Sequence, residues 1–306
     1  MLIKRKGIDI LKLTREEFDI LSEIAVSKRK IGVRALMAKT KYSSEKVNDI
    51  LKKISKKKYI ENGAITDAGL AALEPYRVKR AVFIAAGFGS RMVPITLNTP
   101  KPLVRVKKKR IIDTLLDACI KAEIEEIYIV RGHLWEQFDQ LLYKYPMIKF
   151  IENPRYYKAN NIFSVMLAGK LVKNAYILEA DLFVSNPDII TKYQYSSNFL
   201  GIKVDKSDDW CFTMKDGYID RMCAGGENCY QEVGIAYIAP NDSKQLLKDI
   251  KELYKTDEGK KRLWEYTLFN EYKGHYKVEV RECKKEDIIE IDTFDELKAL
   301  DNSYDV

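Results

Sequence analysis

The stretch that decides the fold is Val82–Val106, VFIAAGFGSRMVPITLNTPKPLVRV. It opens with an apolar segment short enough to be a buried strand. Gly87 and Gly89 follow, and glycine lets the backbone take a positive φ and bring its N–H groups close to a ligand. Arg91 adds a fork of donors that suits phosphate oxygens, and Lys101 stands on a stiff segment between two prolines. The pattern predicts a strand, a glycine turn and two cations that cradle a polyphosphate.

Other readings of the two glycines are weaker. A G-x-G after a strand is often an ordinary turn, so the two glycines alone are weak evidence for a phosphate-binding loop. The dinucleotide fingerprint G-x-G-x-x-G requires a glycine where this chain has Met92, and no G-K-[ST] of a P-loop follows. Only the longer string, A-A-G-x-G-S-R-M-x-P with P-K-P-L after it, favours nucleotide chemistry.

Length and charge indicate two modules with different partners. The chain has 306 residues, which suggests two domains. Residues 1–77 contain 18 lysines and arginines against 10 acidic residues, and this excess equals the net charge of +8 of the whole chain. We therefore expect a basic domain at 1–77 and an electrically balanced domain at 78–306.

The composition also indicates in which cellular compartment the protein is expected. No run of 18 apolar residues is present, and the first residues lack the apolar core of a signal peptide. Five cysteines lie scattered at positions 119, 211, 223, 229 and 283, without C-x-x-C spacing. We expect a cytoplasmic protein with reduced thiols.

The basic module has the pattern of a small helical domain. Thr14-Arg15-Glu16-Glu17 is a capping box that starts one helix, and two further helices are expected from Gly32 and from Ser43. A hairpin around Asn62-Gly63 and a last helix to Leu73 follow. This order resembles a winged helix-turn-helix domain, which would make duplex DNA a partner through the third helix. A dimerisation or packing role is the alternative reading, because basic charge by itself gives only non-specific affinity.

The second module alternates strands and helices, as a parallel α/β sheet does. Two of its expected strands run into an aspartate, at Glu179-Ala180-Asp181 and at Glu290-Ile291-Asp292. Ligands of such sheets bind at the carboxyl ends of the strands. Mg²⁺ bound with phosphates prefers one or two carboxylates, although an aspartate there also commonly caps a turn. Expected strands cover residues 80–86, 126–130, 148–151, 175–180 and 199–204, and expected helices cover 111–122, 135–143, 161–171 and 186–193.

From about Lys79 onward the chain resembles a bacterial CTP:phosphocholine cytidylyltransferase of the nucleotidyltransferase superfamily. The strings AAGFGSRMVPIT and PKPLV carry the superfamily resemblance. The narrower resemblance rests on fewer positions. These are Asn160-Asn161-Ile162-Phe163-Ser164, Asp208-Asp209-Trp210, Gly234-Ile235-Ala236-Tyr237, Leu263-Trp264-Glu265 and the two strand-end aspartates. The family members are single-domain enzymes, so the resemblance leaves the basic module unexplained.

The resemblance implies a Rossmann-like α/β nucleotidyltransferase fold with a mixed, mostly parallel sheet, preceded by the small winged-helix domain. It implies Mg²⁺-dependent conversion of CTP and phosphocholine to CDP-choline and pyrophosphate. The implied roles are catalysis for Arg91 and Lys101, metal binding for Asp181 and Asp292, nucleotide binding for Ala85, Ala86, Gly87, Gly89, Ser90, Asn161 and Ser164, and phosphocholine binding for Asp208, Trp210, Glu232, Tyr237 and Trp264.

The second substrate leaves alternatives open. A trimethylammonium group donates no hydrogen bonds and is held by aromatic faces, which Trp210 and Trp264 could supply. Phosphoethanolamine or aminoethylphosphonate would instead require more carboxylates, because a primary ammonium donates three hydrogen bonds. A sugar 1-phosphate would require a polar pocket. A transcription regulator that only senses a metabolite is the alternative from another class, but it has no need for both cations and both aspartates.

Overall fold

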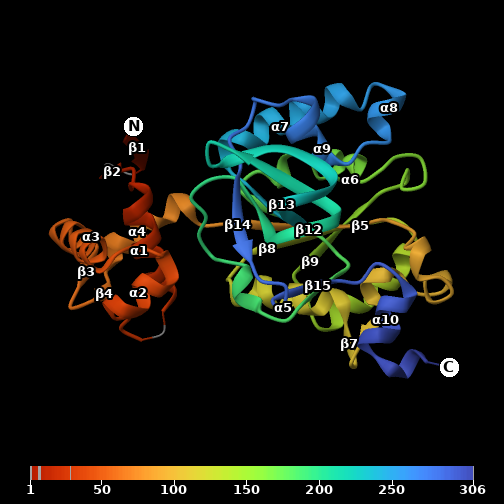
Figure 1. Cartoon of the computed structure of the whole chain (residues 1–306), viewed down its shortest axis with the longest axis horizontal. Coiled ribbons are helices and arrows are strands. Elements are labelled where there is room, and N and C mark those ends of the chain that lie inside the picture. Colours follow the sequence, from red (N-terminus) through yellow and green to blue (C-terminus); the bar gives the residue numbers. More distant parts are fainter. Residues whose placement is uncertain (1, 6–7, 28, 306) are drawn as a thin grey trace. The chain divides into compact units, whose positions relative to one another are not determined.

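The chain forms two compact units, one of residues 1–77 with 192–195 and one of residues 78–191 with 196–306. The computed structural model describes residues 2–5, 8–27 and 29–305. Figure 1 shows the helices and strands of the chain. The first unit has one buried apolar cluster and the second has several. None of the helices in these described ranges has the length and apolar character needed to cross a bilayer.

The first unit is mainly helical. Its elements are β1 (Leu2–Arg5), β2 (Ile8–Leu11), α1 (Arg15–Val26), α2 (Val33–Thr40), α3 (Ser44–Lys56), β3 (Ile60–Glu61), β4 (Ala64–Ile65), α4 (Asp67–Leu73) and the 3₁₀ turn η1 (Glu74–Tyr76). At the start of α1 the Thr14 side chain accepts a hydrogen bond from the Glu17 N–H, at 3.2 Å, and the Glu17 carboxylate accepts one from the Thr14 N–H. The predicted capping box is therefore confirmed.

The core of the first unit is formed by residues of α1, α2, α3 and α4 with the neighbouring turns. Val47, Ile50 and Ile54, spaced at helical intervals on α3, are buried in it. Between β3 and β4, Asn62 and Gly63 have φ of 51° and 79°, the positive pair that a two-residue hairpin turn requires. The helices and the hairpin follow the predicted order, and their assignment to the winged helix-turn-helix class stays a prediction.

The helix expected over residues 186–193 is wrong. Only the single 3₁₀ turn η7 (Pro187–Ile189) forms. The Asn186 side chain caps its start by accepting from the Asp188 N–H, and the chain is extended at Ile190. Tyr193 is buried in the core of the first unit. Tyr195 stacks on Tyr76, with ring centroids 5.4 Å apart.

The second unit is built on a seven-stranded sheet in the order β14-β12-β13-β10-β5-β8-β9. Four neighbouring pairs are parallel, and the pairs β12–β13 and β13–β10 are antiparallel. The mixed, mostly parallel sheet predicted from the sequence is thereby confirmed. Its strands are β5 (Arg80–Ala85), β8 (Glu126–Arg131), β9 (Ile148–Glu152), β10 (Ala175–Glu179), β12 (Asn198–Lys215), β13 (Tyr218–Ile238) and β14 (Glu279–Cys283).

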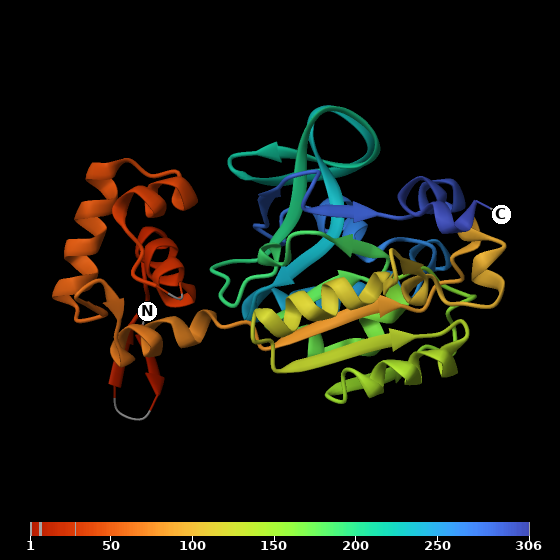
Figure 2. The same cartoon turned by 90° about the horizontal axis from the view of Figure 1, so that it is seen from below.

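Both faces of this sheet are covered, which explains the unbroken apolar run of β5. Ala81, Phe83 and Ala85 point into one core cluster with α5 (Ile111–Lys121), while Val82 lies in the opposite cluster. That second cluster includes residues of α6 (Ile162–Ala168) and α7 (Pro240–Leu253). Figure 2 shows α5 lying along the strands. A parallel strand buried on both sides has this composition.

The hairpin β12–β13 is longer than the strand expected at 199–204. Its near part belongs to the sheet, and several register shifts beyond Ser207 bend its far part. Figure 2 shows this far part projecting from the sheet. β-bulges of this kind bend strands and increase their twist.

Smaller elements complete the second unit. β11 (Leu182–Val184) pairs antiparallel with β15 (Ile288–Glu290), so that Leu182 faces Glu290. The others are the hairpin β6 (Arg105–Val106) and β7 (Lys109–Arg110), the helices α8 (Asp257–Lys260), α9 (Trp264–Tyr266) and α10 (Phe294–Leu300), the π-turn η8 (Thr267–Glu271), and the 3₁₀ turns η2 (Ser90–Met92), η3 (Ile95–Leu97), η4 (Lys101–Leu103), η5 (Trp135–Tyr143), η6 (Gly169–Val172) and η9 (Asn302–Tyr304).

Candidate active site

A pocket of about 450 Å³ lies at the carboxyl ends of β5 and β10. Every residue predicted for nucleotide binding, catalysis or metal binding lines it: Ala85, Ala86, Gly87, Gly89, Ser90, Arg91, Lys101, Asn161, Ser164, Asp181 and Asp292. These residues come from segments far apart in the sequence. The sheet edge therefore brings together cations, carboxylates and a glycine loop in one cavity.

The glycine loop leaves β5 and packs on the lysine segment. Gly89 has φ of 65°, and a Cβ there would lie 3.0 Å from the Cβ of Lys101 and 3.0 Å from Thr96. A side chain at this position would therefore push the loop off the lysine. Nothing lies within 4 Å of a Cβ built on Gly87, so the loop is open at that point and its backbone faces free space.

The pairing of β11 with β15 brings the two aspartates together. Asp181 precedes β11 and Asp292 follows β15, and the Ile291 N–H donates to the Asp181 carbonyl oxygen at 3.4 Å. The Asp292 N–H donates to Glu296, in the first turn of α10, which fixes this strand end. The sequence shows two apolar strands that each lead to an aspartate. The pairing of β11 with β15 brings these two aspartates into one site.

Both cations of the pocket are bound to these aspartates. The Lys101 ammonium lies 2.6 Å from Asp181 and 2.7 Å from Asp292, and Arg91 lies 2.7 Å from the other oxygen of Asp292. Burial alone would lower the pKa of Lys101, but the charge of Asp181 and hydrogen bonds to both carboxylates outweigh it and raise the pKa. Lys101 is therefore charged and buried, whereas the Arg91 side chain is 67% exposed.

The carboxylates fit a divalent cation. One oxygen of Asp181, Oδ1, is buried and has no hydrogen-bond partner. Oxygens of Glu179, Asp181 and Glu290 lie within 4.8 Å of one another. Hard oxygen donors of this type suit Mg²⁺. Asp292, the other predicted metal ligand, lies outside this group and faces Lys101 and Arg91 instead.

Two further buried carboxylates, those of Glu232 and Glu265, lie near Glu179. The Glu232 side chain accepts a hydrogen bond from the Gly234 N–H at 2.6 Å, and Glu265 accepts from the Asn161 amide at 3.2 Å. Burial, followed by the negative charges of neighbouring carboxylates, raises the pKa values of Glu179 and Glu232 well above the usual range. Burial raises the pKa of Glu265 to about 7. These three carboxyl groups form no ion pair with a side chain in the described residues, so burial favours their protonated form.

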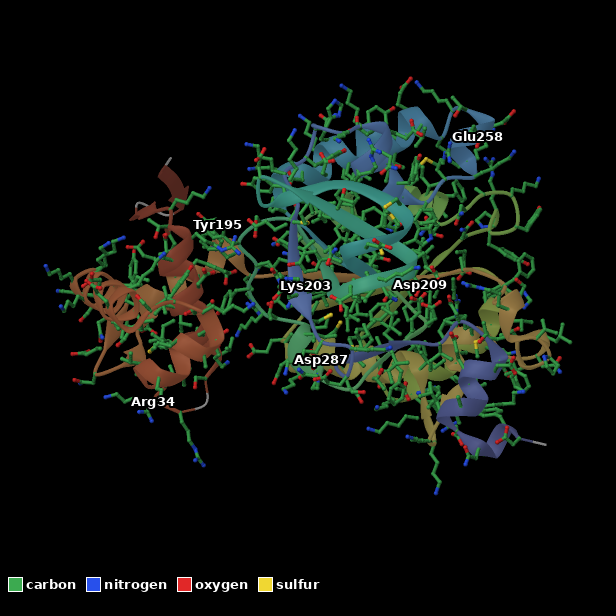
Figure 3. All side chains as sticks on the ribbon, in the orientation of Figure 1. Arg34, Tyr195, Lys203, Asp209, Glu258 and Asp287 are labelled. Carbon is green, nitrogen blue, oxygen red and sulfur yellow. The ribbon has the colours of Figure 1, made fainter. Side chains whose placement is uncertain are left out.

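None of the five residues expected to bind phosphocholine is among the residues that line this pocket. Trp264 is 2% exposed and stacks on Phe199 in the core, at 5.5 Å between ring centroids. Tyr237 is also buried, and its hydroxyl donates to Asn174. Asp208 and Trp210 lie exposed on β12, next to the labelled Asp209 (Figure 3). Of that predicted set, Glu232 belongs to the carboxylate group.

Sequence reasoning missed several residues of the pocket. Glu179 and Glu290 each stand two positions before a predicted aspartate, so the repeated E-x-D was a signal for both. Asn153 follows β9, lines the pocket and donates to the Ser164 hydroxyl at 3.0 Å. Tyr156 also lines the pocket, and no local pattern pointed to it.

Known proteins share both the sequence pattern and the fold. Residues 80–209 match the nucleotidyl transferase family. The chain is 33% identical over 228 residues to the 2-aminoethylphosphonate cytidylyltransferase of Lancefieldella rimae, covering 73% of this chain and 92% of that protein. It is 26% identical to the choline-phosphate cytidylyltransferase of Streptococcus pneumoniae, covering 72% of this chain and 96% of that one.

A solved structure agrees with these relatives. The CTP:phosphocholine cytidylyltransferase from Streptococcus pneumoniae superposes with a TM-score of 0.68 at 26% identity, over 74% of this chain and 99% of that chain. The family match over residues 80–209 includes the glycine loop, Lys101 and Asp181. The chain therefore belongs to the nucleotidyltransferase superfamily, as a cytidylyltransferase that acts on a small phosphorylated substrate.

Proposed function

We propose that this enzyme transfers the cytidylyl group of CTP to a small phosphonate or phosphate that carries a primary ammonium group, with 2-aminoethylphosphonate as the first candidate, and that it requires Mg²⁺. The observation that carries the proposal is a group of carboxylates around Glu179, which lines the pocket: Glu232 and Glu265 are buried close to it, and Glu265 contacts the pocket residue Asn161. A primary ammonium donates three hydrogen bonds and needs such acceptors.

The surroundings favour this substrate over phosphocholine. A trimethylammonium group would be held by aromatic faces, yet Trp264 and Tyr237 are buried in the core. Trp210 is the one aromatic side chain of the expected cage that is exposed, at 38%. The relative from Lancefieldella rimae acts, by its name, on 2-aminoethylphosphonate, which agrees with the acidic pocket. We therefore place phosphocholine second.

The chain's own residues provide a simple mechanism. A phosphonate oxygen of the acceptor attacks the α-phosphorus of CTP, a new P–O bond forms, and the bond to the pyrophosphate oxygen breaks. No strong base is needed, because the attacking oxygen is already ionised near neutral pH. Backbone N–H groups at Gly87 and Gly89 bind the triphosphate, Arg91 holds the departing pyrophosphate, and Lys101 stabilises the charge that builds on the α-phosphate.

The remaining roles concern the metal ion and the cytidine of CTP. Asp181, with Glu290 or Asp292, would hold Mg²⁺, which neutralises polyphosphate charge when it is bound. Asn161 and Ser164 would line the cytidine, with Ser164 oriented by its hydrogen bond from Asn153. Substrate positioning and charge compensation then supply most of the rate enhancement.

Pyrophosphate release tests the proposal. The purified chain is assayed with Mg²⁺ and each of CTP, UTP, ATP and GTP, combined in turn with 2-aminoethylphosphonate, phosphoethanolamine, phosphocholine and glucose 1-phosphate. We expect the highest kcat/KM with CTP and 2-aminoethylphosphonate, at least about tenfold above phosphocholine, since one lost charge-assisted hydrogen bond is worth about 1.5–3 kcal/mol. A preference for phosphocholine would overturn the assignment of the acidic pocket.

We also propose that the first unit binds duplex DNA. Its acidic side chains are largely used in internal ion pairs, such as Lys57 with Glu17 at 2.6 Å and Lys39 with Glu23. Lys53 and Lys56, at the carboxyl end of α3, are exposed and form no ion pair with the described side chains. A helix with an exposed basic end, joined to a small hairpin, suits contact with phosphates.

Salt dependence tests this second role. Binding of a fluorescent duplex of mixed sequence is measured by anisotropy at several salt concentrations. Replacement of Lys53 and Lys56 by serine should weaken binding to all sequences and reduce the slope of log K against log salt by about 2. Lys144→Ser in the second unit is the control. Absence of duplex binding even at low salt would leave dimerisation or packing as the role of this unit.

A further inference from the structure

We propose that Lys101 acts as a built-in competitor of the divalent cation, so that the metal gains full access to its carboxylates only when CTP draws the lysine away. This inference rests on the proposed Mg²⁺ requirement and concerns how the same site is regulated. Its starting observation is that one ammonium bridges Asp181 and Asp292 at 2.6 and 2.7 Å.

The bridge leaves little attraction for a cation. Lys101 and Arg91 together balance the charges of Asp181 and Asp292, so this half of the site is electrically neutral. Lys101 and Arg91 together occupy both oxygens of Asp292 and one oxygen of Asp181, and Asp181 Oδ1 is left without a partner. A metal that uses both aspartates must therefore displace one of these cations from Asp292. The Lys101 side chain is only 10% exposed, and solvent therefore screens its attraction to the carboxylates weakly.

The backbone of Lys101 is held in place, whereas its side chain is flexible enough to take another direction. Its backbone lies in η4, after Pro100 and before Pro102, and its Cβ packs against the glycine loop at Gly89. A lysine side chain has a flexible four-carbon stem. Its tip can therefore move from the aspartates to the phosphate-binding loop, because both line the same pocket of about 450 Å³.

Nucleotide binding supplies the driving force for that movement. The triphosphate of CTP brings several negative charges to the loop that contains Gly87 and Gly89, within reach of both Lys101 and Arg91. When these cations turn to the phosphates, Asp181 and Asp292 lose their counter-charges and bind the metal more strongly. Metal and CTP therefore bind with positive coupling beyond the direct contact between them, and by linkage each strengthens the other equally.

Removal of the lysine charge tests the competition directly. Binding of Mn²⁺ to the full chain is followed by electron paramagnetic resonance of the free ion, without nucleotide and without turnover. Coupling between two ligands is typically about 5–150-fold, so we expect Lys101→Met to tighten Mn²⁺ binding by at least about tenfold in the absence of nucleotide. Lys144→Met, which removes a surface ion pair with Asp117, should leave it unchanged.

Three further measurements make the result decisive. A CTP analogue with a methylene bridge between the α- and β-phosphorus should improve Mn²⁺ affinity of the native chain by a larger factor than that of Lys101→Met. Lys101→Arg, which keeps the charge, should retain weak Mn²⁺ binding, and circular dichroism checks that each variant is folded. Unchanged or weaker Mn²⁺ binding by folded Lys101→Met without nucleotide would overturn the proposal. Because no acceptor substrate is present, this outcome is independent of whether 2-aminoethylphosphonate is the substrate.

Discussion

The replacement Gly234→Ala offers a quantitative test of how the acidic pocket is built. Gly234 lies on β13, next to the pair formed by Ile235 and Leu178, and it faces Glu179 across the strands. Its φ is 69°, and a Cβ there would lie 2.9 Å from the Cβ of Glu179 and 3.0 Å from its carboxylate. The missing side chain is therefore what leaves room for the Glu179 carboxylate.

Two terms add to the expected loss of stability. A side chain at a left-handed position costs about 1–2 kcal/mol. Forcing a β-carbon against another that is attached directly to the backbone resembles overpacking, which costs about 1–3 kcal/mol. Gly234→Ala should therefore lower the free energy of unfolding of the second unit by about 2–5 kcal/mol. It should also raise the KM for the aminophosphonate, because the Glu179 carboxylate has to move.

A matched glycine separates the two terms. Gly217, at the tip of the hairpin β12–β13, has φ of 83°, and nothing lies within 4 Å of a Cβ built on it. Gly217→Ala should therefore show only the conformational loss of about 1–2 kcal/mol. The difference between the two variants measures the contact with Glu179.

Urea unfolding followed by tryptophan fluorescence is the assay. All three tryptophans, Trp135, Trp210 and Trp264, lie in the second unit, so the signal reports that unit and not the first. Equal losses for Gly234→Ala and Gly217→Ala would refute the argument, since they would mean that Glu179 does not occupy the space beside Gly234.

Three other predictions concern the same pocket. Lys101→Ala should lower kcat more than about tenfold, or ~1.4 kcal/mol of barrier, in a protein that remains folded, as measured by pyrophosphate release. Glu265→Gln should raise the KM for 2-aminoethylphosphonate by about 10–100-fold, with little change for CTP, because it removes one charge-assisted acceptor; the exposed Glu258→Gln is its control. Burial raises the pKa of Glu265 from 4.5 to about 7, so the folded protein holds an extra proton between these values, and the free energy of unfolding should fall as pH rises through that window. Urea midpoints at pH 5 and pH 8 should show a smaller fall for Glu265→Gln, and an unchanged fall would contradict the burial of this carboxyl.

Local signals explain why much of the nucleotide half was predictable. The glycine loop, Lys101 between its prolines and the two strand-end aspartates are each visible within a few residues of sequence. The parallel strands place such ends at one edge, so the residues meet although no pattern states their distance. The predicted helix over 186–193 failed because the cap at Asn186 indicates only where a helix can begin, while the burial of Tyr193 in the core of the first unit depends on contacts far away in the sequence.

The substrate half was harder to predict because the role of an aromatic residue depends on the face it occupies. Trp264 and Tyr237 are residue types that suit a cation cage. The register of β13 and the position of the short helix α9 nevertheless direct both side chains into the core. Glu265, adjacent to Trp264, instead contacts Asn161 in the pocket wall. Residue type alone cannot predict which of two neighbouring side chains points into the core and which points towards the pocket.

The repeated E-x-D at the two strand ends explains how one pocket can hold both an anionic nucleotide and a cationic acceptor. Residues two apart on an extended chain point to the same side. Each segment therefore presents two carboxylates to the cavity, Glu179 with Asp181 and Glu290 with Asp292. The aspartates face the cations Lys101 and Arg91, next to the phosphate loop, whereas Glu179 adjoins Glu232 and Glu265. Without ligands, Lys101 and Arg91 neutralise the aspartates. If these cations turn to the phosphates, the metal replaces them at the aspartates, and the ammonium group of the acceptor supplies a positive charge beside the glutamates. The full complex is then electrically balanced as well, which favours assembly before transfer.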